Sequence, residues 1–167
     1  MRPLAPIAPA ALLAAALLAA ALPAQAQNAG QIAQARGGAS CPRCNLFQAD
    51  FSGLKLTGRN FAGARLRQAD LSATVMNRTS FAGADLRDVN AYGGVFTGTS
   101  FAGANLTHAS LVGAYLEGAN FSGANLEGAN FSGAEAGRAA GLTQAQLDRA
   151  CGDEATELPR GLRLRPC

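Results

Sequence analysis

One large apolar residue recurs at every fifth position from residue 46 to residue 131 without a break. Of these 18 positions, only Ala91 holds a residue other than Leu, Phe or Met. A small residue commonly stands two places before each position, and glycine stands two places after 12 of the 18. A strand repeats its apolar residues every two positions and a helix every 3.6, so a period of five fits neither. The period indicates a chain that turns a corner every five residues.

A second, longer period indicates that four corners complete one coil. The segment Asn60-Phe61-Ala62-Gly63-Ala64 recurs almost unchanged at 80–84, 100–104 and 120–124. We therefore expect Phe61, Phe81, Phe101 and Phe121 to stack inside the coils. Glycine after each apolar residue would supply the positive φ of a type II turn. The Asp, Asn or Ser that often precedes the apolar residue would bond the local backbone.

These repeats resemble those of a known family. Ala-Asp-Leu-Arg-Asp at 84–88, Ala-Asn-Phe-Ser-Gly at 119–123 and Ala-Asn-Leu-Glu-Gly at 124–128 are similar to the A(D/N)LXX pattern of pentapeptide-repeat proteins. The resemblance implies an all-β solenoid, a right-handed quadrilateral β-helix, which we place at residues 41–135. Four residues depart from the pattern because they stand where a small inward residue is expected, and they predict local distortion near the first coils: Arg59, Thr74, Thr79 and Thr99.

The sequence before the repeats indicates export. Arg2 is followed by an entirely apolar stretch at 3–24, and Ala24-Gln25-Ala26 has the form of a signal-peptidase site. We expect residues 1–26 to be a signal peptide cut after Ala26, which places the protein in the periplasm or outside the cell with no stable membrane insertion. An uncleaved membrane anchor is the alternative. Residues 27–40 are polar and small, and they predict a flexible leader.

Residues 136–167 are predicted to cap the last coil. Thr143 is a candidate N-cap for a short helix that runs to Ala150, with Leu142 and Leu147 facing the core. The segment 141–153 also looks like the tail of some exported bacterial proteins of the same family. A cap is expected because the open end of a solenoid exposes unpaired backbone and apolar side chains.

Two pairs of cysteines flank the solenoid, and an even number in an exported chain indicates disulfides. About four coils, each about 4.8 Å high, would separate the two ends by roughly 20 Å, which is too far for a disulfide between them. We therefore expect Cys41 to pair with Cys44 and Cys151 with Cys167. The spacing of Cys41 and Cys44 also occurs in redox dithiols, so a thiol oxidoreductase is one alternative function.

The sequence holds no motif for a catalytic, cofactor or metal site, so we expect neither an enzyme nor a bound cofactor. The one histidine, His108, falls at an outward position without partners at motif spacing. Charge also excludes nucleic acid as an expected partner, because residues 44–135 carry six basic and seven acidic side chains.

What remains is the surface, on which the period of one coil predicts columns of outward residues. Val75, Val95 and Tyr115 form one apolar column, and Tyr92 and Val112 lie around the adjoining corner. Exposed apolar side chains that lie together can mark an interface. A second candidate surface is basic and is formed by Arg65, Arg67 and Arg87.

We interpret the chain as a non-enzymatic structural or protein-binding module of the bacterial cell envelope. Its expected partner is another envelope protein or a second copy of itself. The family resemblance also suggests a DNA mimic that binds type II topoisomerases, although such a protein would be cytoplasmic and strongly acidic. Glycan binding through Tyr92 and Tyr115 is a further alternative.

Overall fold

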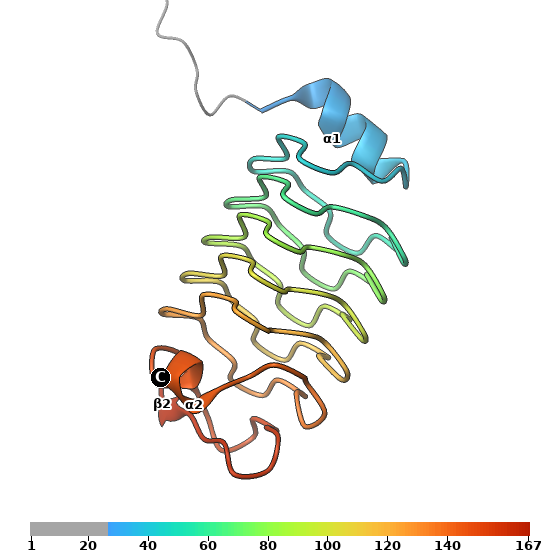
Figure 1. The fold of residues 1–167 in the computed structure, drawn as a ribbon. Helices are drawn as coiled ribbons and strands as arrows, with labels where there is room; N and C mark the ends of the chain where they lie inside the picture. Colours follow the sequence, from blue (N-terminus) through green and yellow to red (C-terminus); the bar gives the residue numbers. More distant parts are fainter. Residues whose placement is uncertain (1–26) are drawn as a thin grey trace, which may run out of the picture.

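The computed structural model describes residues 27–167, which form a rod of stacked coils with a helix at one end and a short cap at the other (Figure 1). Helix α1 spans Ala29–Arg36 and helix α2 spans Gln144–Leu147. The two-residue strands β1 (Cys151–Gly152) and β2 (Arg165–Pro166) pair in parallel. The predicted signal peptide lies outside the described residues. Within 27–167, neither helix is both long and apolar enough to cross a bilayer.

Parallel backbone bridges join each coil to the next at a constant offset along the sequence. The series runs from Asn45 with Arg65 to Asn120 with Ala140. In the first bridge the amide of Leu46 donates to the carbonyl of Arg65 at 2.8 Å, and the amide of Arg65 donates to the carbonyl of Cys44 at 2.9 Å. The constant offset sets the length of the coil and confirms the longer of the two predicted periods. The handedness of the coil stays a prediction of the family resemblance.

Every corner places the same position of the repeat in the left-handed region. The residue two places after each apolar residue has a φ of 60° to 71° where it is glycine. A hydrogen bond across the turn closes most corners, as from the amide of Ala64 to the carbonyl of Phe61 at 3.0 Å. Six corners hold another residue with a φ of 52° to 59°: Gln48, Gln68, Ala73, Arg78, Asp88 and His108. The coil therefore imposes the corner even where glycine is missing.

The interior confirms the predicted phenylalanine stack. The ring centroids of Phe61 and Phe81 lie 5.6 Å apart, those of Phe81 and Phe101 5.6 Å, and those of Phe101 and Phe121 5.1 Å. All four side chains are buried, with the rings within 18° of parallel. Polar residues before the apolar positions bond the local backbone as expected. For example, Asn120 Oδ1 accepts from the amide of Ser122 at 3.0 Å.

The departures from the repeat distort one corner and leave the bridges intact. Thr79 is buried, and its hydroxyl donates to the carbonyl of Leu56 at 2.9 Å and accepts from the amide of Arg59 at 3.4 Å. The hydroxyl therefore bridges the amide of Arg59 and the carbonyl of Leu56. The equivalent two groups bond to each other directly in the neighbouring corners. Arg59 is exposed rather than inward, and its guanidinium lies beside Gly38. Thr74 and Thr99 are buried and donate to backbone carbonyls at 2.8 Å and 2.7 Å.

The leader is a correction to the sequence analysis. Residues 27–40, which we expected to be flexible, hold helix α1 against the first coil, with Ala35 fully buried. Gln31 Oε1 accepts from the amide of Asn45 at 2.7 Å, and Ser40 Oγ accepts from the amide of Asn60 at 3.0 Å. The physical reason is that the first coil has no coil above it. Side chains of the leader therefore take the place of the missing backbone partners.

The C-terminal cap begins with helix α2, which is shorter than predicted because it ends at Leu147 rather than Ala150. Thr143 is the N-cap, and Leu147 is fully buried. Pairing between coils also continues beyond the repeats. Cys151 pairs with Asn130, and Glu157 pairs with Glu135, at offsets slightly longer than one coil. The tail therefore extends the rod by part of another coil, out of phase with the repeats.

Candidate interaction surface

One flat side of the rod carries the predicted apolar column, and we call it the tyrosine face. Successive bridges place Lys55, Val75, Val95, Tyr115 and Glu135 in that order along it. Tyr115 is 44% exposed, and Tyr92, on the corner that precedes this face, is 61% exposed; they are the two exposed large apolar side chains among the described residues. Sequence analysis missed Lys55 and Glu135, although the same period of one coil places them at the two ends of the column.

The tyrosine face is rigid because backbone bonds hold it from both sides. The amide of Tyr115 donates to the carbonyl of Gly94 at 2.9 Å, and its carbonyl accepts from the amide of Phe96 at 2.8 Å. Gly94 gives Phe96 its place in the core, because a Cβ at Gly94 would lie 2.5 Å from the ring atom Cε2. A partner would therefore meet a preformed surface, which lowers the entropy lost on binding.

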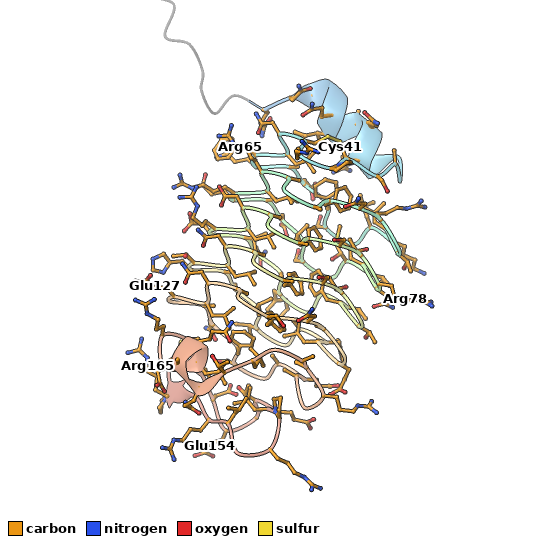
Figure 2. All side chains as sticks on the ribbon, in the orientation of Figure 1. Cys41, Arg65, Arg78, Glu127, Glu154 and Arg165 are labelled. Carbon is orange, nitrogen blue, oxygen red and sulfur yellow. A yellow bond between two sulfur atoms is a disulfide. The ribbon has the colours of Figure 1, made fainter. Side chains whose placement is uncertain are left out.

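The predicted basic residues lie on the opposite side of the four-sided coil, which we call the arginine face and define by Arg65, Arg67 and Arg87. Bridges along this face join Asn45, Arg65 and Asp85, half a coil out of phase with the tyrosine face. Figure 2 shows Arg65 and Glu127 on one side of the rod and Arg78 on the other. The structure therefore does not bring the two groups of candidate residues together.

Acidic neighbours neutralise much of the charge on the arginine face. Arg87 makes two bonds to Asp85, Nε to Oδ1 at 2.7 Å and Nη2 to Oδ2 at 2.6 Å. The bond from Arg87 lowers the pKa of Asp85 below its usual value, and Asp85 in turn raises the pKa of Arg87. Arg67 Nε lies 3.3 Å from Asp88 Oδ2. These pairs occupy donors that an acidic partner would need, so the arginine face is the weaker candidate.

The cysteines pair as the sequence led us to expect, Cys41 with Cys44 and Cys151 with Cys167. Cys41 is 2% exposed and Cys44 9% exposed, and Figure 2 shows Cys41 at the end of the rod that α1 covers. A redox dithiol needs an accessible thiol for exchange with its substrate. Burial of both sulfur-bearing residues therefore weighs against the oxidoreductase alternative.

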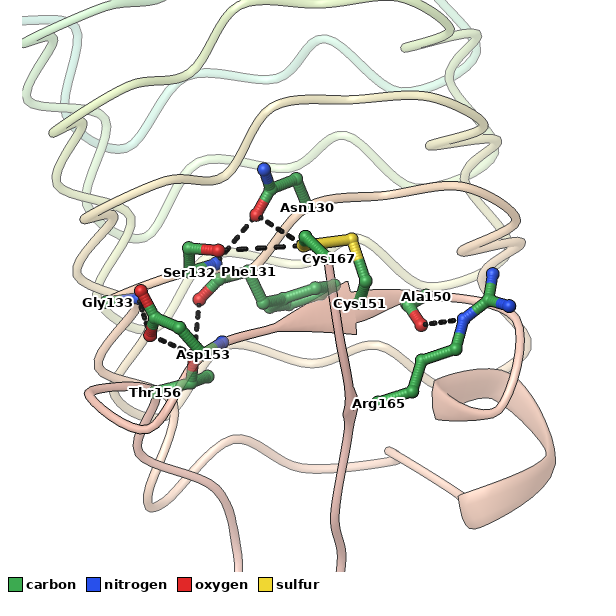
Figure 3. The surroundings of a disulfide bond; sticks show 10 residues. All are labelled: Asn130, Phe131, Ser132, Gly133, Ala150, Cys151, Asp153, Thr156, Arg165 and Cys167. Atoms are coloured by element: carbon green, nitrogen blue, oxygen red, sulfur yellow. Dashed lines mark hydrogen bonds between the residues drawn. A yellow bond between two sulfur atoms is a disulfide. The ribbon is translucent and has the colours of Figure 1, made fainter.

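A pocket of about 520 Å³ opens beside the second disulfide, in the region drawn in Figure 3. The carboxylate of Asp153 lines this pocket and accepts three hydrogen bonds. They come from the amide of Gly133 at 2.8 Å, the amide of Ala155 at 3.1 Å and the hydroxyl of Thr156 at 3.0 Å. The bond from Gly133 is the main cause that lowers the pKa of Asp153. Asp153 thus fastens the tail to the last coil. We therefore assign the pocket to the packing of the cap and do not treat it as a candidate site.

His108 shows no arrangement for catalysis. It is exposed at a corner, and its ring lies against Gly128 of the next coil. Among residues 27–167, no three His, Cys, Asp or Glu side chains gather where they could hold a metal ion. We therefore consider the outward side chains of residues 27–167 for surface contacts.

Comparison with known proteins identifies the repeats. The family model described as pentapeptide repeats matches residues 60–98 and 99–135, with 8 copies. No curated protein sequence matches the chain.

Solved structures of other repeat proteins are also similar. HetL, a pentapeptide repeat protein involved in heterocyst differentiation regulation from Nostoc sp. strain PCC 7120, is 28% identical with a TM-score of 0.37, over 66% of this chain and 56% of HetL. A thylakoid-lumen protein of Arabidopsis thaliana is 29% identical with a TM-score of 0.29, over 64% of this chain and 59% of that one. QnrB1, a plasmid-mediated fluoroquinolone resistance protein, is 18% identical with a TM-score of 0.35, over 77% of this chain and 86% of QnrB1. This chain thus spans less than two thirds of the first two proteins.

Proposed function

The chain belongs to the pentapeptide-repeat family, and from this premise we propose that it is a non-enzymatic protein-binding module of the bacterial cell envelope. The observation that carries the proposal is the position of Tyr92 and Tyr115. Both are exposed, and both lie on or beside one rigid face. Tyrosine is enriched where proteins bind one another, because its ring offers a large contact area with little loss of side-chain entropy.

The choice of the tyrosine face over the arginine face rests on their chemistry. Val75 and Val95 are half-buried and precede Tyr115 in the same column, with Val95 bridged directly to Tyr115, so the centre of the tyrosine face is apolar. The free energy of desolvation therefore favours covering this centre with a partner, because apolar surface is removed from water. The paired arginines, by contrast, would have to leave Asp85 and Asp88 or be buried with them, and both changes carry a desolvation cost.

The envelope location is the part of the proposal that rests mainly on sequence. It is supported by the apolar segment with a cleavage signature at 1–26 and by four cysteines, all of which are paired. Disulfides of this kind persist in oxidising compartments. The near-neutral rod speaks against a DNA mimic, since that role needs a strongly acidic surface.

The location is tested by the intact mass of the chain purified from an exporting bacterial host, before and after reduction and thiol labelling. We expect a mature chain that begins at Gln27 and takes up four labels only after reduction. A chain that keeps residues 1–26 and is labelled without reduction would contradict the envelope location and reopen the chemistry of Cys41 and Cys44.

The binding role is tested by site-specific photocrosslinking in the intact envelope. A photoreactive residue replaces Tyr92 or Tyr115, and a matched control replaces the exposed Asn125, which lies on the arginine face. We expect a discrete crosslinked product from the two tyrosine positions and none from the control. Equal products from all three positions, or none from any, would contradict a binding role for the tyrosine face.

A further inference from the structure

The column along the tyrosine face is self-complementary in charge. Its order is Lys55, Val75, Val95, Tyr115 and Glu135, so one end is basic, the middle is apolar and the other end is acidic. Lys55 is exposed and Glu135 half-buried. No ion pair or hydrogen bond of either side chain occurs within residues 27–167, so both remain available to a partner.

We propose that the tyrosine face binds the same face of a second copy, with the two rods antiparallel and a two-fold axis through Val95. This inference rests on the proposed function and names the partner of the same face. In an isologous contact, residue i of one copy meets residue j of the other and the reverse also holds. An axis at Val95 therefore places Lys55 opposite Glu135 at both ends of the contact. Val75 then lies opposite Tyr115.

The charges select the antiparallel orientation. If the two rods ran parallel in register, Lys55 would meet Lys55 and Glu135 would meet Glu135. Like charges placed together in an interface are costly, and opposite charges both orient the partners and speed their encounter. Glu157, which follows Glu135 in the column, adds to the acidic end and strengthens the same preference.

The corner beside the face fits the same symmetry. Tyr92 lies in the same coil as Val95, at the level of the two-fold axis. The two-fold axis lies in the plane of the contact and runs across the rods. Rotation about it reverses the direction of the rod but leaves each corner on the same edge of the interface. The Tyr92 rings of the two copies therefore meet on one edge of the interface. This contact would cover both of the exposed large apolar side chains.

The size of the face sets the expected strength of the dimer. One side of a four-sided coil is narrow, and stable interfaces bury about 800 Å² on each partner. The pair is thus a reversible, concentration-dependent dimer rather than an obligate one. Its formation leaves the other three sides of each rod free.

The test is sedimentation velocity on the full exported chain over a range of concentrations, with charge-reversal variants. Glu135→Lys alone and Lys55→Glu alone each create two like-charge contacts, and each should weaken dimerisation about tenfold or more. The double variant exchanges the two charges and should restore the affinity to within about threefold of the original. Glu127→Lys makes the same change of charge on the arginine face and should leave the dimer unchanged.

A separate variant tests the apolar centre. Tyr115→Ser should weaken dimerisation about tenfold or more, because buried aromatic residues contribute most to interfaces of this kind. Far-ultraviolet circular dichroism establishes that each variant keeps its fold. A wild-type chain that stays monomeric, or a double variant no better than the single ones, would overturn the antiparallel dimer.

The crosslinking experiment separates this failure from failure of the proposed function. If the chain is monomeric while the Tyr92 and Tyr115 positions crosslink a different protein, the second copy is the wrong partner and the binding role stands. If the chain is monomeric and those positions crosslink nothing, both proposals fail.

Discussion

Glycine has two separate uses in this rod, and two positions show them apart. Gly103 has a φ of 65°, and a Cβ added there would meet nothing within 4 Å. Gly94 lies outside the left-handed region, but a Cβ there would lie 2.5 Å from Phe96. The first glycine serves a corner conformation, and the second makes room for a core side chain. Six corners already accept other residues, which shows that the first use tolerates substitution.

The two uses predict different costs for the same change. Gly103→Ala should lower the free energy of unfolding by about 1 kcal/mol, the cost of a left-handed residue with a side chain. Gly94→Ala should lower it by about 2–3 kcal/mol, because Phe96 must leave its packed position. Urea denaturation followed by circular dichroism measures both. An equal loss from the two variants would contradict this division of roles.

At the scale of elements, the two ends of the rod are closed by different means. The leader covers the first coil with side-chain bonds to unpaired backbone groups, from Gln31 in helix α1 and from Ser40 after it, whereas the C-terminal tail adds backbone bridges of its own. Arg165 Nε of the tail donates to the carbonyl of Ala150 at 3.2 Å, and the amide of Cys167 donates to the carbonyl of Gly152 at 3.1 Å. The leader and the tail thus cover edges of the kind that promotes aggregation, and each end also holds a disulfide.

The docking of α1 leads to a prediction with a matched control. Ala35→Glu places a charge at a fully buried position of the helix and should detach it. The amide of Asn45 would then lose its acceptor, Gln31, and exchange with solvent about tenfold faster or more. Ala33→Glu, on the exposed side of the same helix, should leave this rate unchanged. Hydrogen exchange followed by mass spectrometry or NMR gives the rates, and unchanged exchange in Ala35→Glu would show that α1 does not protect the first coil.

Much of the element structure could be predicted from the sequence, and α1 could not. The coils follow from a strict period, and the cap helix follows from Thr143 at its N-cap. The signal for helix α1 is weaker, because it has an N-cap, Asn28, but fully buries one small residue, Ala35, so no apolar pattern marks it in the sequence. The candidate site was predicted only in part. The period places each outward residue in a column, but the pairing of Arg87 with Asp85 depends on side-chain conformations that the period does not determine.

At the scale of the whole molecule, each coil bonds only to the coils directly above and below. Phe101 lies at the centre of this arrangement, fully packed between Phe81 and Phe121. In a repeat protein of this kind, the stability of the whole is roughly a sum of coil stabilities and of the interfaces between neighbours. Weakening one central interface should therefore affect how the two halves unfold together.

Phe101→Ala should divide the cooperative unit. The substitution removes a buried ring and should cost about 3–5 kcal/mol. The two halves would then unfold in separate steps, which lowers the apparent m-value of urea denaturation. Phe131→Ala, a loss of the same side chain from the last repeats, should lower the midpoint and leave a single transition. A single transition with an unchanged m-value in Phe101→Ala would show that the rod does not divide at this coil.

The constant offset between bridged residues also limits how such a gene can change in length. Loss or duplication of a segment as long as that offset removes or adds one whole coil. The columns on the two sides of the change then stay aligned with each other. A change by a single pentapeptide keeps the pattern of small and large side chains, so the core remains filled. It nevertheless rotates everything on one side of the change by a quarter turn. Lys55 and Glu135 would then stand on adjacent sides of the rod, and a fully folded protein would have lost its continuous tyrosine face.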